Sequence, residues 1–262
     1  MKNILIARRT LVLLVVSVLL VANIARADEI KVMTSGAFTA PLLEVIPEFE
    51  RTTGHKVATA FGASMGGAPD SIPSRLERGE PVDVVILARP ALEALIEQKR
   101  VVPGSAVDLV RSIIGVAVRV GAHKPDISSV EALKRTLLEA RSIAYSASAS
   151  GVYLSTELFP RLGIADQIRG KSRRIESERV GAVVARGDAE IGFQQVSELL
   201  PVPGIDYLGP LPEEVQQVTV FSAGIATGAR ARDAARALID FLTSRAVVAT
   251  IRKSGLEPVR LP

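Results

Sequence analysis

The sequence contains no cysteine and no tryptophan, and only two of its 262 residues are histidine. Without cysteine the chain has no disulfide, thiol nucleophile, cysteine-ligated zinc, iron–sulfur cluster or cysteine-linked lipid anchor. His55 and His123, which we expect at surface positions, are too few for a histidine-rich metal site, and a Ser/His/Asp triad is nearly excluded. We therefore expect no metal.

Aromatic residues are also scarce, at 4%, and positive charge is in excess only at the amino-terminal end. Four of the 32 Lys and Arg residues lie in residues 1–27, which hold no acidic residue, so the remaining chain has 28 basic and 28 acidic residues. Nucleic-acid binding needs a basic face and stacking rings, so nucleic acid is not an expected partner. A hydrophobic fraction of 48% is typical of a globular protein, and this length allows two lobes.

Residues 1–27 have the pattern of a signal peptide. Basic residues precede an apolar run, Leu11–Ala22, and Ala25 and Ala27 supply the small residues of a cleavage site. The run is too short for the roughly 20 residues that a bilayer core needs. We expect a periplasmic protein that starts at Asp28 and has no stable membrane insertion after cleavage.

The rest of the chain alternates between strand and helix patterns. Glu29–Met33 is predicted as a strand, and apolar residues at helical spacing follow it up to Gly54: Leu42, Leu43, Ile46 and Phe49. Val84–Leu87 is predicted as a buried strand. Ser128 stands three residues before Glu131, a capping-box spacing that predicts a helix start.

This alternation predicts an α/β fold with parallel sheets covered on both faces. We expect the two-lobed architecture of periplasmic binding proteins, with residues 28–112 and 218–262 in lobe 1 and residues 113–217 in lobe 2. Ligands of such sheets bind at the carboxyl ends of strands, so the site is expected in the crevice between the lobes.

Three turns after predicted strands are rich in small and hydroxyl residues: Thr34–Ala37, Gly62–Ser71 and Ser146–Gly151. Hydroxyls and free backbone N–H groups at helix starts form a neutral cradle for an anion. Ser and Gly are also ordinary turn and capping residues, so each turn alone is a weak signal. No glycine pattern here matches a nucleotide-binding loop.

Several segments carry a family resemblance: Thr53-Gly54-His55-Lys56-Val57, Phe61-Gly62-Ala63-Ser64, Arg78-Gly79-Glu80-Pro81-Val82-Asp83-Val84, Ser150-Gly151-Val152-Tyr153 and Val184–Gly192. With these segments, practically the whole chain after residue 27 resembles periplasmic molybdate-binding proteins of the type 2 solute-binding fold. The resemblance implies a ligand crevice between two lobes.

The departures from that family concern the ligand-facing turns. The family's first oxyanion-contacting serine corresponds to Ala37, with Ser35 as a substitute, while its second serine is retained as Ser64. Gln195 replaces the usual tyrosine, and Gly66–Asp70 lengthens one turn. These features resemble the subgroup that includes aconitate isomerase, which implies a small polycarboxylate anion as ligand and needs no cofactor.

The expected site combines donors for carboxylates with one acid–base group. The expected substrate-binding residues are Ser35, Gly36, Ser64, Met65, Arg75, Ser150, Gly151, Arg179 and Gln195. Isomerisation of aconitate moves a double bond through an allylic proton shift, so one base must reach two carbons. The candidates for that catalytic residue are Asp70, Glu178 and Tyr153.

Two functions remain open at this point. The first is an exported isomerase that interconverts trans-aconitate and cis-aconitate. The second is a non-enzymatic binding protein that delivers molybdate, tungstate or an organic anion to the permease of an ABC importer. Both use an interlobe crevice, so the fold does not separate them.

Overall fold

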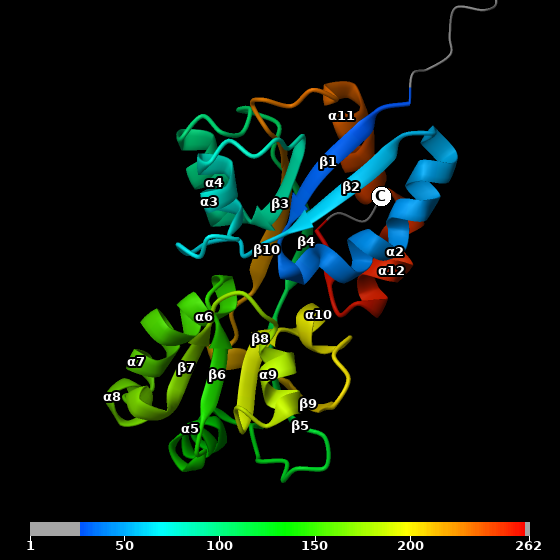
Figure 1. Cartoon of the computed structure of the whole chain (residues 1–262). Coiled ribbons are helices and arrows are strands. Elements are labelled where there is room, and N and C mark those ends of the chain that lie inside the picture. The colour runs from blue at the N-terminus through cyan, green and yellow to red at the C-terminus, as the bar shows by residue number, and fades with distance from the viewer. Residues whose placement is uncertain (1–26, 260–262) are drawn as a thin grey trace, which may run out of the picture.

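The computed structural model describes residues 27–259, so the predicted signal peptide lies almost entirely outside the described residues. The chain forms two mixed sheets, each with its own helices, stacked one above the other in Figure 1. The predicted two-lobed α/β architecture is confirmed. Within residues 27–259, no helix is long and apolar enough to cross a bilayer.

The first lobe is built on a six-stranded sheet of order β11-β4-β10-β3-β1-β2. Its strands are β1 (Glu29–Thr34), β2 (Lys56–Phe61), β3 (Val84–Ala88), β4 (Val107–Ser112), β10 (Thr219–Ile225) and β11 (Glu257–Pro258). Its helices are α2 (Gly36–Thr53), α3 (Ile72–Glu77), α4 (Arg89–Glu97), α11 (Arg232–Leu242) and α12 (Val248–Lys253).

The second lobe is built on a five-stranded sheet of order β7-β6-β8-β5-β9. Its strands are β5 (Ile114–Arg119), β6 (Ile143–Ser146), β7 (Ser172–Ile175), β8 (Ile191–Gln195) and β9 (Ile205–Pro210). Its helices are α5 (Val130–Glu139), α6 (Ala149–Tyr153), the π-helical η1 (Leu154–Leu158), α7 (Phe159–Arg161), α8 (Ala165–Ile168), α9 (Val180–Arg186) and α10 (Val196–Leu199).

The sheets are mixed, and the prediction of parallel sheets was wrong for part of each. β1 pairs in parallel with β2 and β3, whereas β10 is antiparallel to β3 and β4. In the second sheet β6 is parallel to β7 and β8, and β5 is antiparallel to β8 and β9. The chain leaves the first lobe after β4 and returns in β10, so β10 enters the sheet from the opposite end.

Strand β3 explains how the first lobe buries its sheet. All five residues of β3 are buried, and they alternate between two clusters. Val84, Ile86 and Ala88 pack on the side of α2 and α11, while Val85 and Leu87 pack on the side of α3 and α4. A strand covered on both faces reads as a continuous apolar run, as Val84–Leu87 does.

Helix α2 is the element that brings the first lobe to the site. Its buried residues include Leu42, Val45 and Phe49, and it ends at Gly54, which has a left-handed φ of 79°. Leu43, predicted among the packing residues, is instead 47% exposed and lines the interlobe cavity. Leu42 and Phe49 are buried and Ile46 packs partly buried on the core, so the predicted spacing holds for the helix with Leu43 as the exception.

The cap of α5 also differs from the prediction. Its N-cap is Ser129, whose Oγ accepts a hydrogen bond from the Ala132 N–H at 3.1 Å. Ser128 instead bonds through its backbone N–H to Asp126. Either of two adjacent serines before a helix can serve as its N-cap, and in this fold the second one, Ser129, does so.

Candidate functional site

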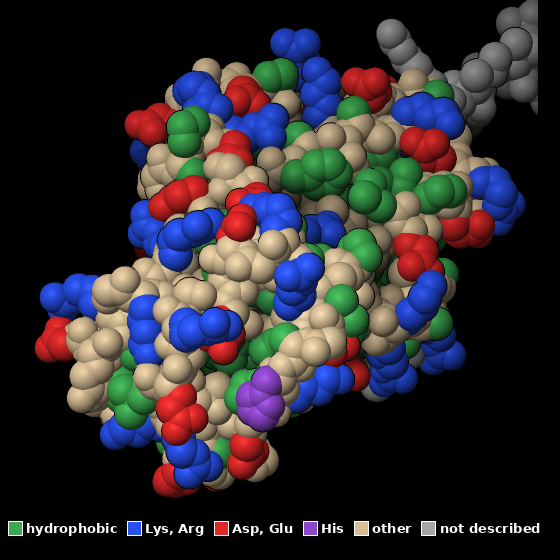
Figure 2. Space-filling view, turned by 60° about the horizontal axis from the view of Figure 1, so that its bottom comes forward, with side chains coloured by type: hydrophobic (Ala, Val, Ile, Leu, Met, Phe, Trp, Pro, Cys, Tyr) green, Lys and Arg blue, Asp and Glu red, His purple; other side chains and the backbone are tan. Residues whose placement is uncertain are grey.

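A cavity of about 400 Å³ lies between the lobes and is lined by both. The first lobe contributes residues from the start of α2 (Ser35, Gly36, Ala37, Thr39, Leu43), the end of β2 and the following loop (Phe61, Gly62, Ala63, Asp70), and Phe221 of β10. The second lobe contributes Ser146, Ala147, Ser148, Ala149, Ser150, Ile175, Glu176, Ser177, Glu178, Arg179, Gln194, Gln195 and Glu198. On the face of the molecule shown in Figure 2, basic and acidic side chains are interspersed.

The start of α2 forms one wall of the cavity. Its N-cap Ser35 is 2% exposed and makes no side-chain cap, and its Oγ has no hydrogen-bond partner among residues 27–259. The first N–H groups of a helix lack acceptors within it, and the helix dipole favours negative charge there. An unpaired buried hydroxyl beside such N–H groups is suited to bind an anionic oxygen.

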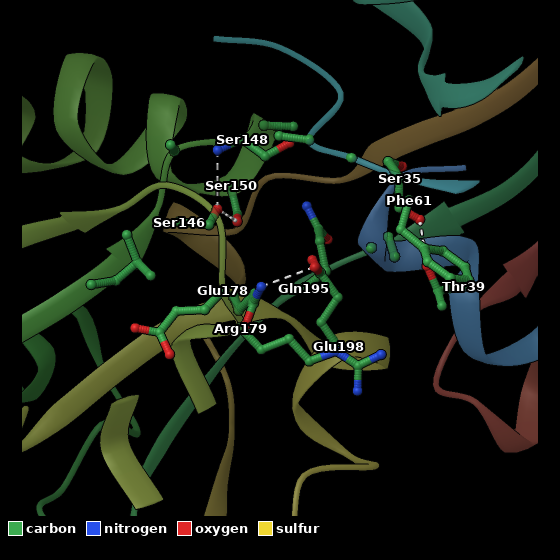
Figure 3. A pocket seen from close by; sticks show the side chains of 18 of the residues that line it. Ser35, Thr39, Phe61, Ser146, Ser148, Ser150, Glu178, Arg179, Gln195 and Glu198 are labelled. Carbon is green, nitrogen blue, oxygen red and sulfur yellow. Dashed lines mark hydrogen bonds between the residues drawn. The ribbon is translucent and has the colours of Figure 1, made fainter. Parts of the chain in front are cut away.

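Three serines form the opposite wall, as Figure 3 shows. Ser146 and Ser150 share a hydrogen bond of 3.0 Å between their hydroxyls, and the Ser148 N–H donates to Ser146 Oγ at 3.4 Å. Gly151 lets the helix start approach the strand, since a Cβ there would overlap the Ser146 carbonyl. The Ser64 N–H donates to Ser148 Oγ at 3.2 Å and so joins the lobes at this wall.

Between these walls, β8 and α10 place two amides and a carboxyl (Figure 3). Gln194 and Gln195 end β8 and are 3% and 2% exposed. Glu198 follows on α10, and its Oε1 accepts a hydrogen bond of 2.9 Å from Gln194 Nε2. Its carboxyl lies against the start of α2, where a Cβ on Gly36 would overlap Oε1.

Glu198 has the most distinctive electrostatic environment in the cavity. Burial raises the pKa of Glu198 to about 7, although the Arg179 charge and hydrogen bonds from Gln194 and the Gln195 backbone lower it. A carboxyl with a pKa near neutrality can both accept and return a proton. Glu178, which also lines the cavity, has instead a pKa lowered by its hydrogen bonds with Arg186.

Arg179 supplies positive charge to the cavity. It is the N-cap of α9 and is half-buried, and among the described lining residues it is the one cation. Figure 3 shows its side chain extending in the direction of Glu198. A guanidinium in this place suits a carboxylate of a ligand.

Comparison with known proteins identifies the family. Residues 30–257 match the family of bacterial extracellular solute-binding proteins. The chain belongs to this family. It is 48% identical over 228 residues to aconitate isomerase of a Pseudomonas species, which covers 87% of each chain. It is 29% identical over 246 residues to the molybdate-binding protein ModA of Azotobacter vinelandii, 90% of this chain and 92% of that one.

A solved structure of the Azotobacter vinelandii periplasmic molybdate-binding protein has the same fold. Its TM-score is 0.70 at 23% identity, over 89% of this chain and 99% of that chain. At this identity the likeness shows the fold alone. The resemblance to molybdate-binding proteins and the aconitate isomerase subgroup, drawn from the sequence, is confirmed.

In this solute-binding protein, five of the expected substrate-binding residues line the cavity: Ser35, Gly36, Ser150, Arg179 and Gln195. Four do not: Ser64, Met65, Arg75 and Gly151. Ser64 is fully buried, and its hydroxyl accepts from the Ala88 N–H at 3.0 Å. Met65 packs on the hydrophobic clusters of the first lobe.

Arg75 has local partners in the first lobe. Its Nε donates to Glu80 at 2.7 Å and its Nη1 to the Phe61 carbonyl at 3.1 Å. Glu80 also accepts from Arg78 at 2.8 Å. The guanidinium is therefore engaged within its own lobe and outside the cavity lining.

The three predicted catalytic candidates lie in different settings. Asp70 lines the cavity and accepts a hydrogen bond of 3.1 Å from Ser177, which joins the two lobes. Glu178 also lines the cavity, but Arg186 binds both its oxygens at 2.8 and 3.1 Å and lowers its pKa. Tyr153 lies outside the lining, donates its hydroxyl to the Val215 carbonyl at 2.8 Å, and has a pKa raised by burial.

Glu198 is a lining residue that the sequence does not single out, whereas the two amides after the apolar strand, Gln194 and Gln195, are awkward in a buried sheet unless a polar group meets them. Gln194 and Glu198 belong to the segment Phe193–Glu198, which resembles the subgroup that includes aconitate isomerase. Their i,i+4 spacing after an apolar strand was an available signal, since a short helix directly after the strand brings them together. That Glu198 would meet Gly36 depended on the packing of the two lobes.

Proposed function

We propose that this chain is an exported isomerase that interconverts trans-aconitate and cis-aconitate by a cofactor-free allylic proton shift. The observation that carries the proposal is the Glu198 carboxyl, with a pKa of about 7, inside an interlobe cavity lined by anion-binding groups. The 48% identity to aconitate isomerase supports the same reading.

The substrate is a tricarboxylate, so the cavity must hold several anionic oxygens. In the proposed mode, Ser35 and the N–H groups at the start of α2 bind one carboxylate, and Ser148 and Ser150 bind a second. Arg179 binds the third. Each group donates a hydrogen bond, and donors fixed before binding stabilise charge without reorganisation.

Glu198 acts as the base in this mechanism. Its carboxylate takes a proton from the methylene carbon, and the C–H electron pair is delocalised over the conjugated carbons and a carboxylate. The protonated Glu198 then returns the proton to the carbon two positions away, and the double bond shifts. No electron is gained or lost overall, so the reaction needs no redox cofactor in principle.

The same carboxyl distinguishes the isomerase from the carrier alternative. A carrier that only holds and releases an anion needs fixed donors and no proton-exchanging group, whereas the isomerase needs a carboxyl such as Glu198 in its cavity. A carrier for molybdate, tungstate or an organic anion is still the second candidate, because the family includes molybdate-binding relatives.

The deciding experiment follows the ultraviolet absorbance of cis-aconitate mixed with the purified chain from Asp28 onward in metal-free buffer. We expect the absorbance to drift to the trans/cis equilibrium, and the same endpoint from trans-aconitate. Calorimetry with molybdate is the parallel measurement. An unchanged spectrum together with tight molybdate binding would replace the isomerase by the carrier.

The proposed location is the periplasm. It is supported by membership of an extracellular family and by the export pattern of residues 1–27. Amino-terminal sequencing of the protein recovered from a periplasmic extract is expected to begin at Asp28. A chain that retains residues 1–27 in the membrane fraction would contradict this.

A further inference from the structure

Gln194 uses both ends of its amide inside the protein. The side chain is 3% exposed at the end of β8. Its Oε1 accepts a hydrogen bond of 2.9 Å from the Val180 N–H, and its Nε2 donates at 2.9 Å to Glu198 Oε1. Both contacts are made within the second lobe.

The chemistry of these partners fixes the orientation of the amide. The Val180 N–H can only donate, so the amide oxygen must face it and the NH₂ group must face Glu198. Turning the amide over would set two donors against each other in a buried place. Gln195 has no such constraint, since its Nε2 lies 3.4 Å from the Thr219 hydroxyl and its Oε1 has no hydrogen-bond partner in the described part of the chain.

Gln194 also holds the start of α9. The N-cap of α9 is Arg179, which makes no side-chain cap, and the Val180 N–H that Gln194 binds is the first of that helix. An acceptor for such an N–H stabilises a helix start. One side chain therefore fixes both the carboxyl of Glu198 and the segment from which Arg179 extends.

We propose that Gln194 is a positioning residue of this site: by holding Oε1 of Glu198, it leaves Oε2 as the oxygen that exchanges the proton with the substrate. This rests on the proposed function. The hydrogen bond from Gln194 and the close approach to Gly36 both fall on Oε1, which is why proton exchange is assigned to Oε2.

The groups that face Glu198 allow a prediction about pH. Arg179 from α9 and the Gln195 backbone N–H act with Gln194 to favour the ionised carboxyl, and burial opposes them. The first turn of α2 carries no charged side chain. Loss of the Gln194 donor leaves burial less opposed, so the pKa of Glu198 rises.

The test compares the pH profiles of kcat/KM for the wild type, Gln194→Met and Gln195→Met. A hydrogen bond to a charged group is worth enough to move a pKa by about one unit or more. We expect the acid limb of Gln194→Met to move upward by about one pH unit. In the matched control Gln195→Met, equally buried but without a side-chain bond to Glu198, rates change while the limb stays in place.

A second variant covers the case in which Gln194→Met does not fold. Gln194→Glu keeps an acceptor for the Val180 N–H but sets two carboxyls side by side, which then share a proton. Its acid limb is expected to move further upward than that of Gln194→Met. If the folded variants lose activity but keep the acid limb of kcat/KM at the wild-type pH, Gln194 has a purely structural role.

A readout without turnover separates this inference from the proposed function. Titration of the Glu198 carboxyl by ¹³C NMR, assigned with Glu198→Gln, measures its pKa directly in the wild type and in Gln194→Met. If aconitate is not isomerised, the proposed function fails and the NMR titration still tests the contact. Equal titration midpoints in both proteins would overturn the positioning role.

Discussion

Oε1 of Glu198 occupies the space that a side-chain carbon on Gly36 would fill. Gly36 belongs to the first lobe and Glu198 to the second, so the proposed base meets the start of α2 where the lobes join. A hydrogen bond of 2.8 Å from Ser197 Oγ to the Ala37 carbonyl holds this junction. The absence of a side chain at position 36 is thus a condition for the site.

Gly36→Ala is expected to reduce kcat at least tenfold while the protein stays folded. The added methyl group overlaps Oε1 of Glu198, so the carboxyl or the lobe contact must move, and small displacements of a catalytic group cost large factors. Thermal unfolding and turnover are the two measurements. Gly170→Ala is the control, because a Cβ there meets nothing within 4 Å. Equal turnover rates of Gly36→Ala and Gly170→Ala would show that Glu198 is not the base at this position.

Glu198→Gln is expected to lower kcat by about 10² to 10⁴, the usual contribution of a general base. The amide keeps the shape and a hydrogen-bond acceptor, so the cavity should still bind substrate. A thermal shift with cis-aconitate measures that binding separately from turnover. Glu190→Gln is the matched control, a partly buried carboxyl of the same lobe that bonds Arg141 and lies outside the cavity lining. Full activity of Glu198→Gln would assign the base elsewhere.

The rate should depend on pH with the sign of a carboxylate base. Because Glu198 must be ionised to take a proton, kcat/KM is expected to rise with pH up to about 7 and then level off. The Arg179 charge lowers the pKa of Glu198, so Arg179→Met should move this limb to higher pH as well as raise KM. A rate that falls as pH rises through 7 would indicate that an acid, not this base, limits turnover.

The fold was predictable as far as it depends on local pattern. The buried run of β3 and the Gly54 end of α2 follow from apolar periodicity and from glycine's access to positive φ. The antiparallel direction of β10 could not be read from the sequence, because periodicity does not encode which end of a sheet a returning strand enters. The place of Leu43 could not be read from the sequence either, since helical spacing does not show that this position faces the interlobe cavity.

The site was predictable where a strand end and a helix start share an edge. Ser35, Gly36 and Ser150 follow from that rule. Glu198 lies on the four-residue helix α10, and its proposed role depends on contact with a glycine on the other lobe. Arg75 lies outside the lining because it pairs locally with Glu80, five residues later, and a sequence pattern does not show whether an arginine takes a local partner or faces a ligand.

The titration of Glu198 should also affect the stability of the protein. The free energy of unfolding is expected to fall as pH rises, whereas the rate is expected to rise. The folded pKa of Glu198 is about 7 against an ordinary 4.5, so the folded state binds this proton more strongly than the unfolded state. The contribution of Glu198 to stability is therefore fully present below pH 4.5 and is lost as pH rises through 7. The loss amounts to about 3 kcal/mol by the usual conversion of a pKa shift.

Urea unfolding of the wild type and of Glu198→Gln between pH 4 and about 8.5 isolates this contribution. All other titrating groups are shared, so they cancel in the difference between the two free energies of unfolding. We expect the wild type to lose stability relative to the variant across pH 4.5 to 7, and the difference to stay constant above that window. If the two curves run parallel throughout, the carboxyl titrates at its ordinary pKa, and it can no longer serve as both acceptor and donor of the proton near neutral pH.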